Sequence, residues 1–319
     1  MATKARRWEP NMTIKAYQPD DLFQIGKDNI KYKESNSLHQ IRYNQGNDQG
    51  ILDISTKVPF IHFPSLSKYD FIKHGFSTRL GGVSSNHLST MNLSFDRGDS
   101  AENVTMNYDR ICHSLKLNNS SLVFSDQIHD SKIHKVTHLD APKTKKYVKN
   151  LIGFDGLITN EPNLTLVTSY ADCVPLYFVD PVHKAIGLSH SGWKGTVQKI
   201  GLKTIQAMKD NFDTDPTELI AVIGPSICFD CYEISEDVAM EFKHNFSPDV
   251  TNKILFQKEN GKYQLDLWLT NQAILLEAGM QKENISNSNI CTCCNSNLLF
   301  SHRASNGQRG NLAGFLCLV

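Results

Sequence analysis

The stretch LTLVTSYADCVPLYFVDPVHKAIGLSHSGWKG, residues 164–195, decides the fold. It contains three apolar runs rich in β-branched residues, at 164–169, 174–179 and 184–190. Runs of this length, separated by segments that carry Asp and Pro, are typical of β-strands. The sequence therefore predicts three consecutive strands.

The break between the second and third runs, DPVH at 180–183, has the composition of a four-residue hairpin loop. If Val179 pairs with Lys184, counting back along both strands places Cys173 opposite His190. Directly opposed side chains have Cβ atoms about 4.5–5.5 Å apart, so a thiolate and an imidazole there can bind one metal ion. The hairpin predicts a Cys/His metal pair.

The composition is that of an ordinary globular protein. Of 319 residues, 40% are hydrophobic, and 33 Lys and Arg balance 33 Asp and Glu. With no net charge, the protein has no overall electrostatic attraction to nucleic acid or to a membrane surface, so we expect neither as a partner. The chain has no apolar run of 18 residues and no secretory signal pattern, so its eight cysteines are expected to be reduced thiols or metal ligands in the cytosol.

The flanking segments predict an extension, further helices and a mixed β-sheet. Residues 1–57 are polar and are expected to form an extension with a few edge strands, followed by the main domain at 58–319. Helical spacing of apolar residues predicts helices at 101–117 and 196–211. Further predicted elements are a strand at 122–130 that ends on Gln127-Ile128-His129, a strand at 219–224 parallel to 184–190, a helix capped at Ser235, and a helix from Asp266 to Gly279.

One arginine outside the hairpin is a candidate for anion binding. Arg79 enters the turn Leu80-Gly81-Gly82, and the loop that follows carries Asn92. An Arg beside flexible glycines can offer its planar fork to a phosphate or a purine edge. The plain alternative is a surface Arg beside a turn.

The motifs HGFSTRLGGVS, MNLSFDRGD, QIH, GFDGLIT, YADCVPLYFVD, HSGWKG, IGPSIC, CYE and FSHR, with Cys-Thr-x-Cys at 291–294, occur in this order. In this combination, over residues 58–319, the chain resembles the YfiH-like family, also called the multi-copper polyphenol oxidase or laccase-domain family. The resemblance implies an α+β fold of mixed β-sheets packed with helices, the cytotoxic necrotising factor-like type.

The resemblance also implies an activity and a metal. It assigns His129, Cys173 and His190 as metal ligands and catalytic residues, with zinc bound and copper possible. The activity implied is a zinc-dependent purine nucleoside phosphorylase. It would cleave adenosine, inosine, guanosine and methylthioadenosine with phosphate to the free base and the phosphorylated sugar, and would deaminate adenosine. The expected partners are thus small molecules, and the chain is expected to be a monomer or homodimer.

Further roles follow for residues near these motifs. Asp172 is a candidate for proton transfer or for orienting a ligand, with a turn residue that caps its own backbone as the plain alternative. Arg79 and Arg303 are expected to hold phosphate or substrate, with Asn92 and Lys194 as further substrate or phosphate contacts. Lys194 stands where the family commonly has Arg and lacks its bidentate geometry.

Three other interpretations remain. A copper polyphenol oxidase is one, although the twelve histidines include no His-x-His pair of the kind a multicopper site uses. A cysteine hydrolase that edits peptidoglycan precursors, with Cys173 as nucleophile and His190 as base, is another. The third is a structural zinc site of Cys228 and Cys231 with Cys291, Cys293 or Cys294. For these cysteines we expect buried reduced thiols instead.

Overall fold

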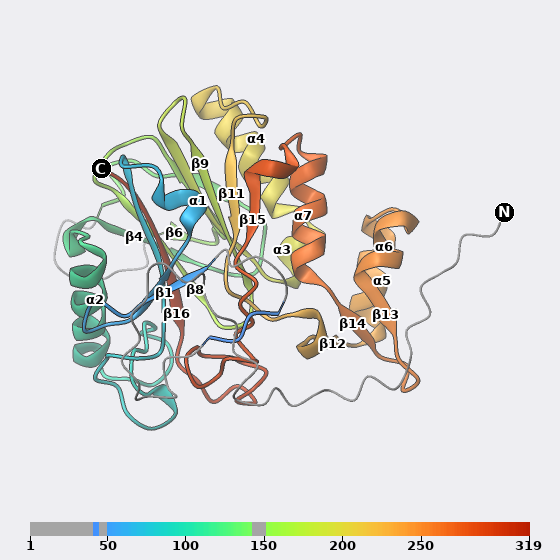
Figure 1. The fold of residues 1–319 in the computed structure, drawn as a ribbon, viewed down its shortest axis with the longest axis horizontal. Helices are drawn as coiled ribbons and strands as arrows, with labels where there is room; N and C mark the ends of the chain where they lie inside the picture. The colour runs from blue at the N-terminus through green and yellow to red at the C-terminus, as the bar shows by residue number, and fades with distance from the viewer. Residues whose placement is uncertain (1–40, 45–49, 142–150) are drawn as a thin grey trace, which may run out of the picture. The chain divides into compact units, whose positions relative to one another are not determined.

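The computed structural model describes residues 41–44, 50–141 and 151–319, all of which belong to one compact unit, Asn36–Val319 (Figure 1). Most of the predicted extension, residues 1–40 and 45–49, lies outside the described residues. Ile51–Asp53, at its end, forms the edge strand β1. Every helix within the described ranges is too short or too polar to span a bilayer.

Two mixed sheets form the centre of the fold, as predicted from the sequence. Within the described residues, the first has the strand order β1-β2-β3-β16-β8-β4-β6. Its strands after β1 are β2 (Phe60–His62), β3 (Ile72–Ser77), β16 (Leu312–Leu318), β8 (Thr165–Tyr170), β4 (Leu122–Asp126) and β6 (Leu151–Ile152). β16 pairs antiparallel with β3 and β8, whereas β4 is parallel to both β8 and β6.

The second sheet has the strand order β15-β11-β9-β10-β7-β5. Its strands are β15 (Ile285–Asn287), β11 (Ile220–Ile223), β9 (Val174–Asp180), β10 (Ala185–Ser191), β7 (Gly156–Thr159) and β5 (Ile133–Lys135). β9 and β10 form the predicted hairpin, and β11 is antiparallel to β9 and hence parallel to β10. The pairs β11/β15 and β5/β7 are parallel.

Alternation along β9 shows how the sheets are buried on both faces. Leu176 and Phe178 belong to a core shared with helices, whereas Tyr177 and Val179 belong to a core shared with the first sheet. Successive residues of a strand point to opposite faces, so a strand covered on both sides reads as a continuous apolar run. This is why the runs at 164–190 are so apolar.

Helices cover the outer face of each sheet, giving four layers (Figure 1). α2 (Ala101–Leu115) covers the first sheet, with Val104 and Tyr108 packed near Phe315. α4 (Ile200–Phe212) and α7 (Leu267–Glu277) cover the second. A small sheet of β12 (Glu233–Ile234), β14 (Tyr263–Leu265) and β13 (Leu255–Gln257) joins α5 (Glu236–Asn245) and α6 (Pro248–Ile254) beside α7. Within the described ranges, the remaining short helices are α1 (Pro64–Ser67), α3 (Trp193–Val197), η3 (Asn86–Leu88), η4 (Asn119–Ser121), η5 (Phe229–Cys231) and η6 (Lys282–Asn284).

The predicted hairpin register is wrong by two residues. Ala185 pairs with Asp180, and His190 pairs with Pro175 rather than with Cys173. Asp180 stays in the strand because its carboxylate accepts hydrogen bonds from the backbone N–H of Val182 and His183, each at 2.9 Å. The four-residue loop is therefore 181–184.

The helix predicted at 196–211 is also wrong in its start and its continuity. Helical structure begins three residues earlier as α3, and the left-handed backbone of Lys199, with φ 57°, separates it from α4. The predicted 122–130 strand is shorter than expected and ends at Asp126. The helices α5 and α7 start directly after Ser235 and Asp266, but only the Asp266 side chain caps its helix, by accepting the N–H of Leu269 at 2.9 Å. Gly279 adopts φ +94° just after α7.

We expect His74, on β3, to make stability pH-dependent. Burial, followed by the charge of His62, lowers the pKa of His74 to about 3, while its Nε2 accepts the N–H of Phe63 at 2.9 Å. Between about pH 6.5 and 3 the unfolded chain binds a proton that the folded chain does not, so the free energy of unfolding falls as pH falls, by up to about 1.4 kcal/mol per pH unit. The variant His74→Gln keeps an acceptor without this titration. In urea unfolding from pH 7 to pH 4, the stability advantage of the wild type should shrink, and a constant difference would contradict the assignment.

Candidate metal centre

The structure brings together the three residues predicted as metal ligands. Ligand atoms of His129, Cys173 and His190 all lie within 4.8 Å of one another. His129 Nε2 is 4.0 Å from Cys173 Sγ, and the two imidazole rings meet edge to face with centroids 4.9 Å apart. Cys173 immediately precedes β9 and His190 is near the end of β10, so the actual register makes them diagonal neighbours, which long side chains still bridge.

A buried carboxylate holds two of these ligands in place. Asp155, directly before β7, is 0% exposed, and its Oδ1 lies 2.8 Å from His190 Nδ1. The same carboxylate accepts backbone N–H groups of Ile128, His129 and Asp130 at 3.1, 3.1 and 2.9 Å. Bonding at Nδ1 turns Nε2 of His190 toward the other two ligands, the usual arrangement behind a metal-binding His.

Gln127 fixes the loop that carries His129. Its side-chain oxygen accepts the N–H of Ser169 at 2.8 Å, and its side-chain N–H donates to the Ser169 carbonyl at 3.1 Å. These bonds attach the end of β4 to β8. His129 itself is exposed, so it lies on the solvent-accessible side of the centre. Its backbone is in the left-handed region, with φ 61°.

Gly192 leaves room for the three ligands. A Cβ atom there would lie 3.0 Å from His129 Cδ2, 3.2 Å from Cys173 Sγ and 3.5 Å from His190 Cε1. Two of these distances are tighter than nine in ten real Cβ contacts, so a larger residue would displace His129 or Cys173 by a few tenths of an ångström. Gly192 therefore lets the three ligands approach closely.

The electrostatics of the centre favour a cation. Burial alone would raise the pKa of the Cys173 thiol, but the charge of His190 and hydrogen bonds to both imidazoles outweigh it and lower the pKa to about 6. Burial alone would lower the pKa of His190, yet Cys173 and Asp155 raise it to about 9. For Asp155, the bond from His190 and its charge overcome burial and hold its pKa below the ordinary value. Without metal, His190 thus keeps a proton in the place that a metal cation would occupy.

The donor set fits a catalytic zinc ion. Two imidazoles and one thiolate are zinc ligands, and three protein ligands leave a fourth position for water or substrate. Among the described residues, only two groups bring the ligand atoms of three or more His, Cys, Asp or Glu side chains within 4.8 Å of one another, and this is one of them. A multicopper site would need several His-rich groups, and the described residues do not supply them.

Asp172 and Arg303 are joined next to Cys173. Asp172 has φ 85°, and its carboxylate accepts the hydroxyl of Thr292 at 2.6 Å and the backbone N–H of Arg303 at 2.7 Å. The exposed Arg303 guanidinium donates to the carbonyls of Cys231 and Glu233 and lies 5.5 Å from the centroid of the Tyr232 ring.

The other predicted substrate residues are placed differently. Arg79 is half-buried, lies over the Phe300 ring at 4.6 Å, and donates to two backbone carbonyls at 2.9 and 2.8 Å. Asn92 is fully buried, and its amide bonds to Ser94, Asp99 and Asn311, which uses both its donors and its acceptor. Lys194, in α3, is exposed beside its neighbour Trp193.

Arg309 is a candidate that the sequence analysis missed. It is only 9% exposed, and its Nε meets no hydrogen-bond acceptor among the described residues. Burial and the charge of Arg97 lower its pKa to about 10, while Asp172 and Cys173 oppose that shift from nearby. Together with Arg79, it lines a pocket whose wall also includes Ser301 and Phe300. Its position in a polar terminal segment gave no signal.

Comparisons with known proteins identify the family and the fold of the chain. The family described as multi-copper polyphenol oxidoreductase laccase matches residues 73–319. A Bacillus subtilis protein named purine nucleoside phosphorylase YlmD is 36% identical over 243 residues, which cover 76% of this chain and 87% of the relative. A Bacteroides thetaiotaomicron protein named purine nucleoside phosphorylase is 31% identical, over 82% of this chain and 97% of the relative. The crystal structure of the Bacillus licheniformis protein YfiH superposes with a TM-score of 0.79 at 32% identity, over 84% of this chain and 99% of that one.

These matches and the fold define an α+β protein of the YfiH type. The chain belongs to the multi-copper polyphenol oxidoreductase laccase family, also called YfiH-like.

We expect Asp155→Asn to weaken metal binding at this centre. An amide cannot accept every N–H group that faces Asp155 and places no negative charge behind the His190 imidazole, so the ligands lose their orientation and His190 becomes a weaker donor to the metal. Outer-shell changes of this kind typically lower metal affinity by about 10–100-fold. Zinc titration against a competing chelator measures the effect, with Asp140→Asn, which removes an ion pair with His134 elsewhere, as the control. Equal affinities of Asp155→Asn and wild type would contradict this role.

Proposed function

We propose that this chain is a zinc-dependent purine nucleoside phosphorylase that also deaminates adenosine. The observation that carries the proposal is the convergence of His129, Cys173 and His190 on one point behind the buried Asp155. The names of the relatives at 36% and 31% identity support the substrate class. The substrates proposed are adenosine, inosine, guanosine and methylthioadenosine.

The reaction needs an anion site beside the metal centre. In phosphorolysis a phosphate oxygen forms a bond to C1′ of the ribose, the bond from C1′ to the purine nitrogen breaks, and the leaving base takes up a proton. A bound zinc ion would supply positive charge and a water of lowered pKa, the latter for deamination of adenosine. The chain must bind and orient the phosphate.

Arg309 is the residue we assign to phosphate. A guanidinium N–H that is buried without an acceptor is costly, and an anion that accepts from it removes that cost. Arg97 and Arg303 act with Arg309 on one neighbour, because burial and the charges of these three arginines lower the pKa of His302. The arginines offer positive charge near the thiolate of Cys173, whose charge opposes the lowering of the Arg309 pKa.

Asp172 acts in this proposal as a positioning residue. Both of its oxygens already accept hydrogen bonds, from Thr292 and from the backbone of Arg303. It therefore holds the Arg303 segment against the loop that carries Cys173. Asn92 is likewise a positioning residue, for the segment that carries Arg309. Its side-chain oxygen accepts the N–H of Asn311, two residues after Arg309.

Product analysis tests the activity. Zinc-loaded protein with adenosine should release adenine and ribose 1-phosphate only when phosphate is present, and should form inosine with or without it. His129→Ala removes a ligand, so the rates of both phosphorolysis and deamination should fall by more than the roughly 10–100-fold typical of an outer-shell change. The matched control is His138→Ala, an exposed histidine paired with Glu161 at 3.6 Å. Unchanged adenosine in every wild-type reaction would refute the proposal.

Kinetics test the phosphate site. We expect Arg309→Gln to raise KM for phosphate by about 10–100-fold, because a hydrogen bond to a charged group contributes about 1.5–3 kcal/mol. KM for adenosine should change little, and Arg309→Lys should restore part of the phosphate affinity because it restores the charge. The control is Arg110→Gln, whose exposed guanidinium donates to the carbonyls of Gly81 and Gly82. An unchanged KM for phosphate would exclude Arg309 from this role.

A further inference from the structure

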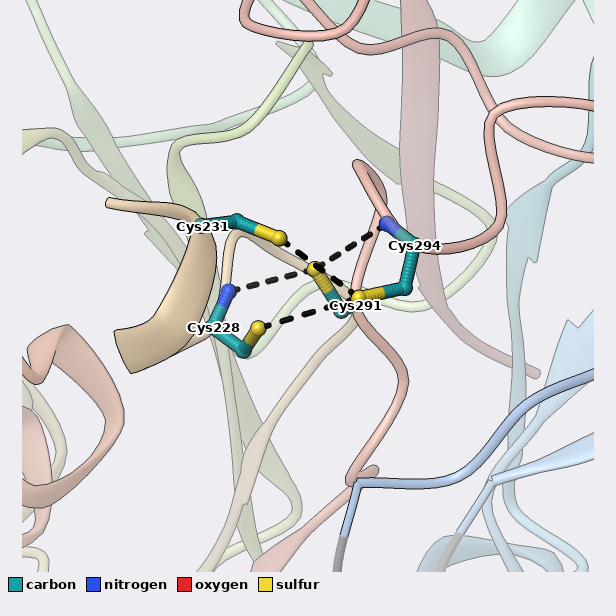
Figure 2. Close-up of side chains that lie close together, drawn as sticks. All are labelled: Cys228, Cys231, Cys291 and Cys294. Atoms are coloured by element: carbon teal, nitrogen blue, oxygen red, sulfur yellow. Dashed lines mark hydrogen bonds between the residues drawn. The ribbon is translucent and has the colours of Figure 1, made fainter. Parts of the chain in front are cut away.

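Four cysteines form a second cluster beside the candidate metal centre. Cys228 and Cys231 are the ends of one Cys-x-x-Cys segment, and Cys291 and Cys294 are the ends of another. Figure 2 shows the four side chains directed toward one point, from two loops far apart in the sequence. All four sulfur atoms lie within 4.8 Å of one another.

The sulfur positions match the geometry of a tetrahedral metal site. With zinc–sulfur bonds of about 2.3 Å, the sulfurs of a regular tetrahedron are about 3.8 Å apart. The Sγ atoms of Cys231 and Cys294 are 3.5 Å apart, and those of Cys228 and Cys294 are 3.9 Å apart (Figure 2). A disulfide requires about 2.05 Å, and all four cysteines are free.

The backbone around Cys291 favours a thiolate. Its Sγ accepts the N–H of Cys228 at 3.3 Å and that of Cys294 at 3.4 Å. Cys291 is 0% exposed and Cys228 is 3% exposed, so water does not solvate the charge of either sulfur. Buried like charges this close repel one another unless a cation lies between them. Spacing, burial and donor directions all point to a bound ion.

We propose that Cys228, Cys231, Cys291 and Cys294 bind a structural Zn²⁺ ion, distinct from the metal held by His129, Cys173 and His190. Four thiolates complete the tetrahedron and leave no position for water or substrate, as in closed structural sites. An iron–sulfur cluster would place several iron and sulfide atoms between the cysteines and so hold their sulfurs farther apart. The short distances between the four sulfur atoms therefore fit a single metal ion.

This ion would stabilise the part of the active site that carries Asp172 and Arg303. Thr292 lies inside the second Cys-x-x-Cys segment and donates its hydroxyl to Asp172 at 2.6 Å. The Cys231 carbonyl accepts from the Arg303 guanidinium at 3.4 Å. The metal would therefore hold both loops at the distance that these contacts need, without taking part in the reaction.

Metal counting tests the proposal independently of the first centre. In the double variant His129→Ala/Cys173→Ser, which lacks two ligands of the other centre, elemental analysis should find one zinc per chain. Adding Cys294→Ser should remove that zinc, whereas adding Cys293→Ser, the adjacent cysteine outside the four, should leave it. The result does not depend on whether the chain is a phosphorylase.

A spectroscopic measurement covers the case in which Cys294→Ser fails to fold. The double variant His129→Ala/Cys173→Ser, reloaded with Co²⁺, should show the intense visible and thiolate charge-transfer bands of tetrahedral sulfur coordination. Zinc should abolish these bands by displacement. A double variant that contains no metal and gives no thiolate bands with Co²⁺ would overturn the proposal, and so would iron in place of zinc in the purified protein.

Discussion

The buried carboxylate of Asp155 is the interaction on which the candidate metal centre depends. A buried charge is costly unless hydrogen bonds compensate for it, and here three backbone N–H groups and the His190 imidazole do so. The backbone donors belong to the loop after β4 of the first sheet, and His190 belongs to β10 of the second. One side chain therefore ties the two sheets together at the point where the ligands meet.

Strand directions explain why the candidate metal ligands and the cysteine cluster lie at the same edge of the second sheet, the one formed by the ends of its strands. β10, β11 and β15 end at this edge, and β7 and β9 begin there, because neighbouring strands have the directions given by their registers. Residues just outside these strand ends are Asp155, Cys173 and the two Cys-x-x-Cys segments. Segments that are distant in sequence thus become neighbours through strand order alone.

The sequence predicted the strands of this region well and their register poorly. The apolar runs at 164–190 correspond closely to β8, β9 and β10, because burial on both faces leaves an unmistakable pattern. The register depends on where the turn begins, and a carboxylate at Asp180 that caps the turn is invisible to composition. Cys173 and His190 still meet, since a shift of two residues keeps both side chains on the same face.

The roles of residues whose partners are distant in the sequence could not be predicted from the sequence alone. Asp155 stands inside the quoted motif GFDGLIT, where an acid within an apolar run is itself a sign of a buried carboxylate, yet its partners are 25 to 35 residues away. Arg309 gave no comparable sign, because its burial arises from loops that only the fold assembles. Spacing alone marked Cys228-x-x-Cys231 and Cys291-Thr-Cys-Cys294 as pairs, but the parallel pairing of β11 with β15 is what brings them together. Since Thr292 then reaches Asp172, the same pairing also links the cysteine cluster to the loop that carries Cys173.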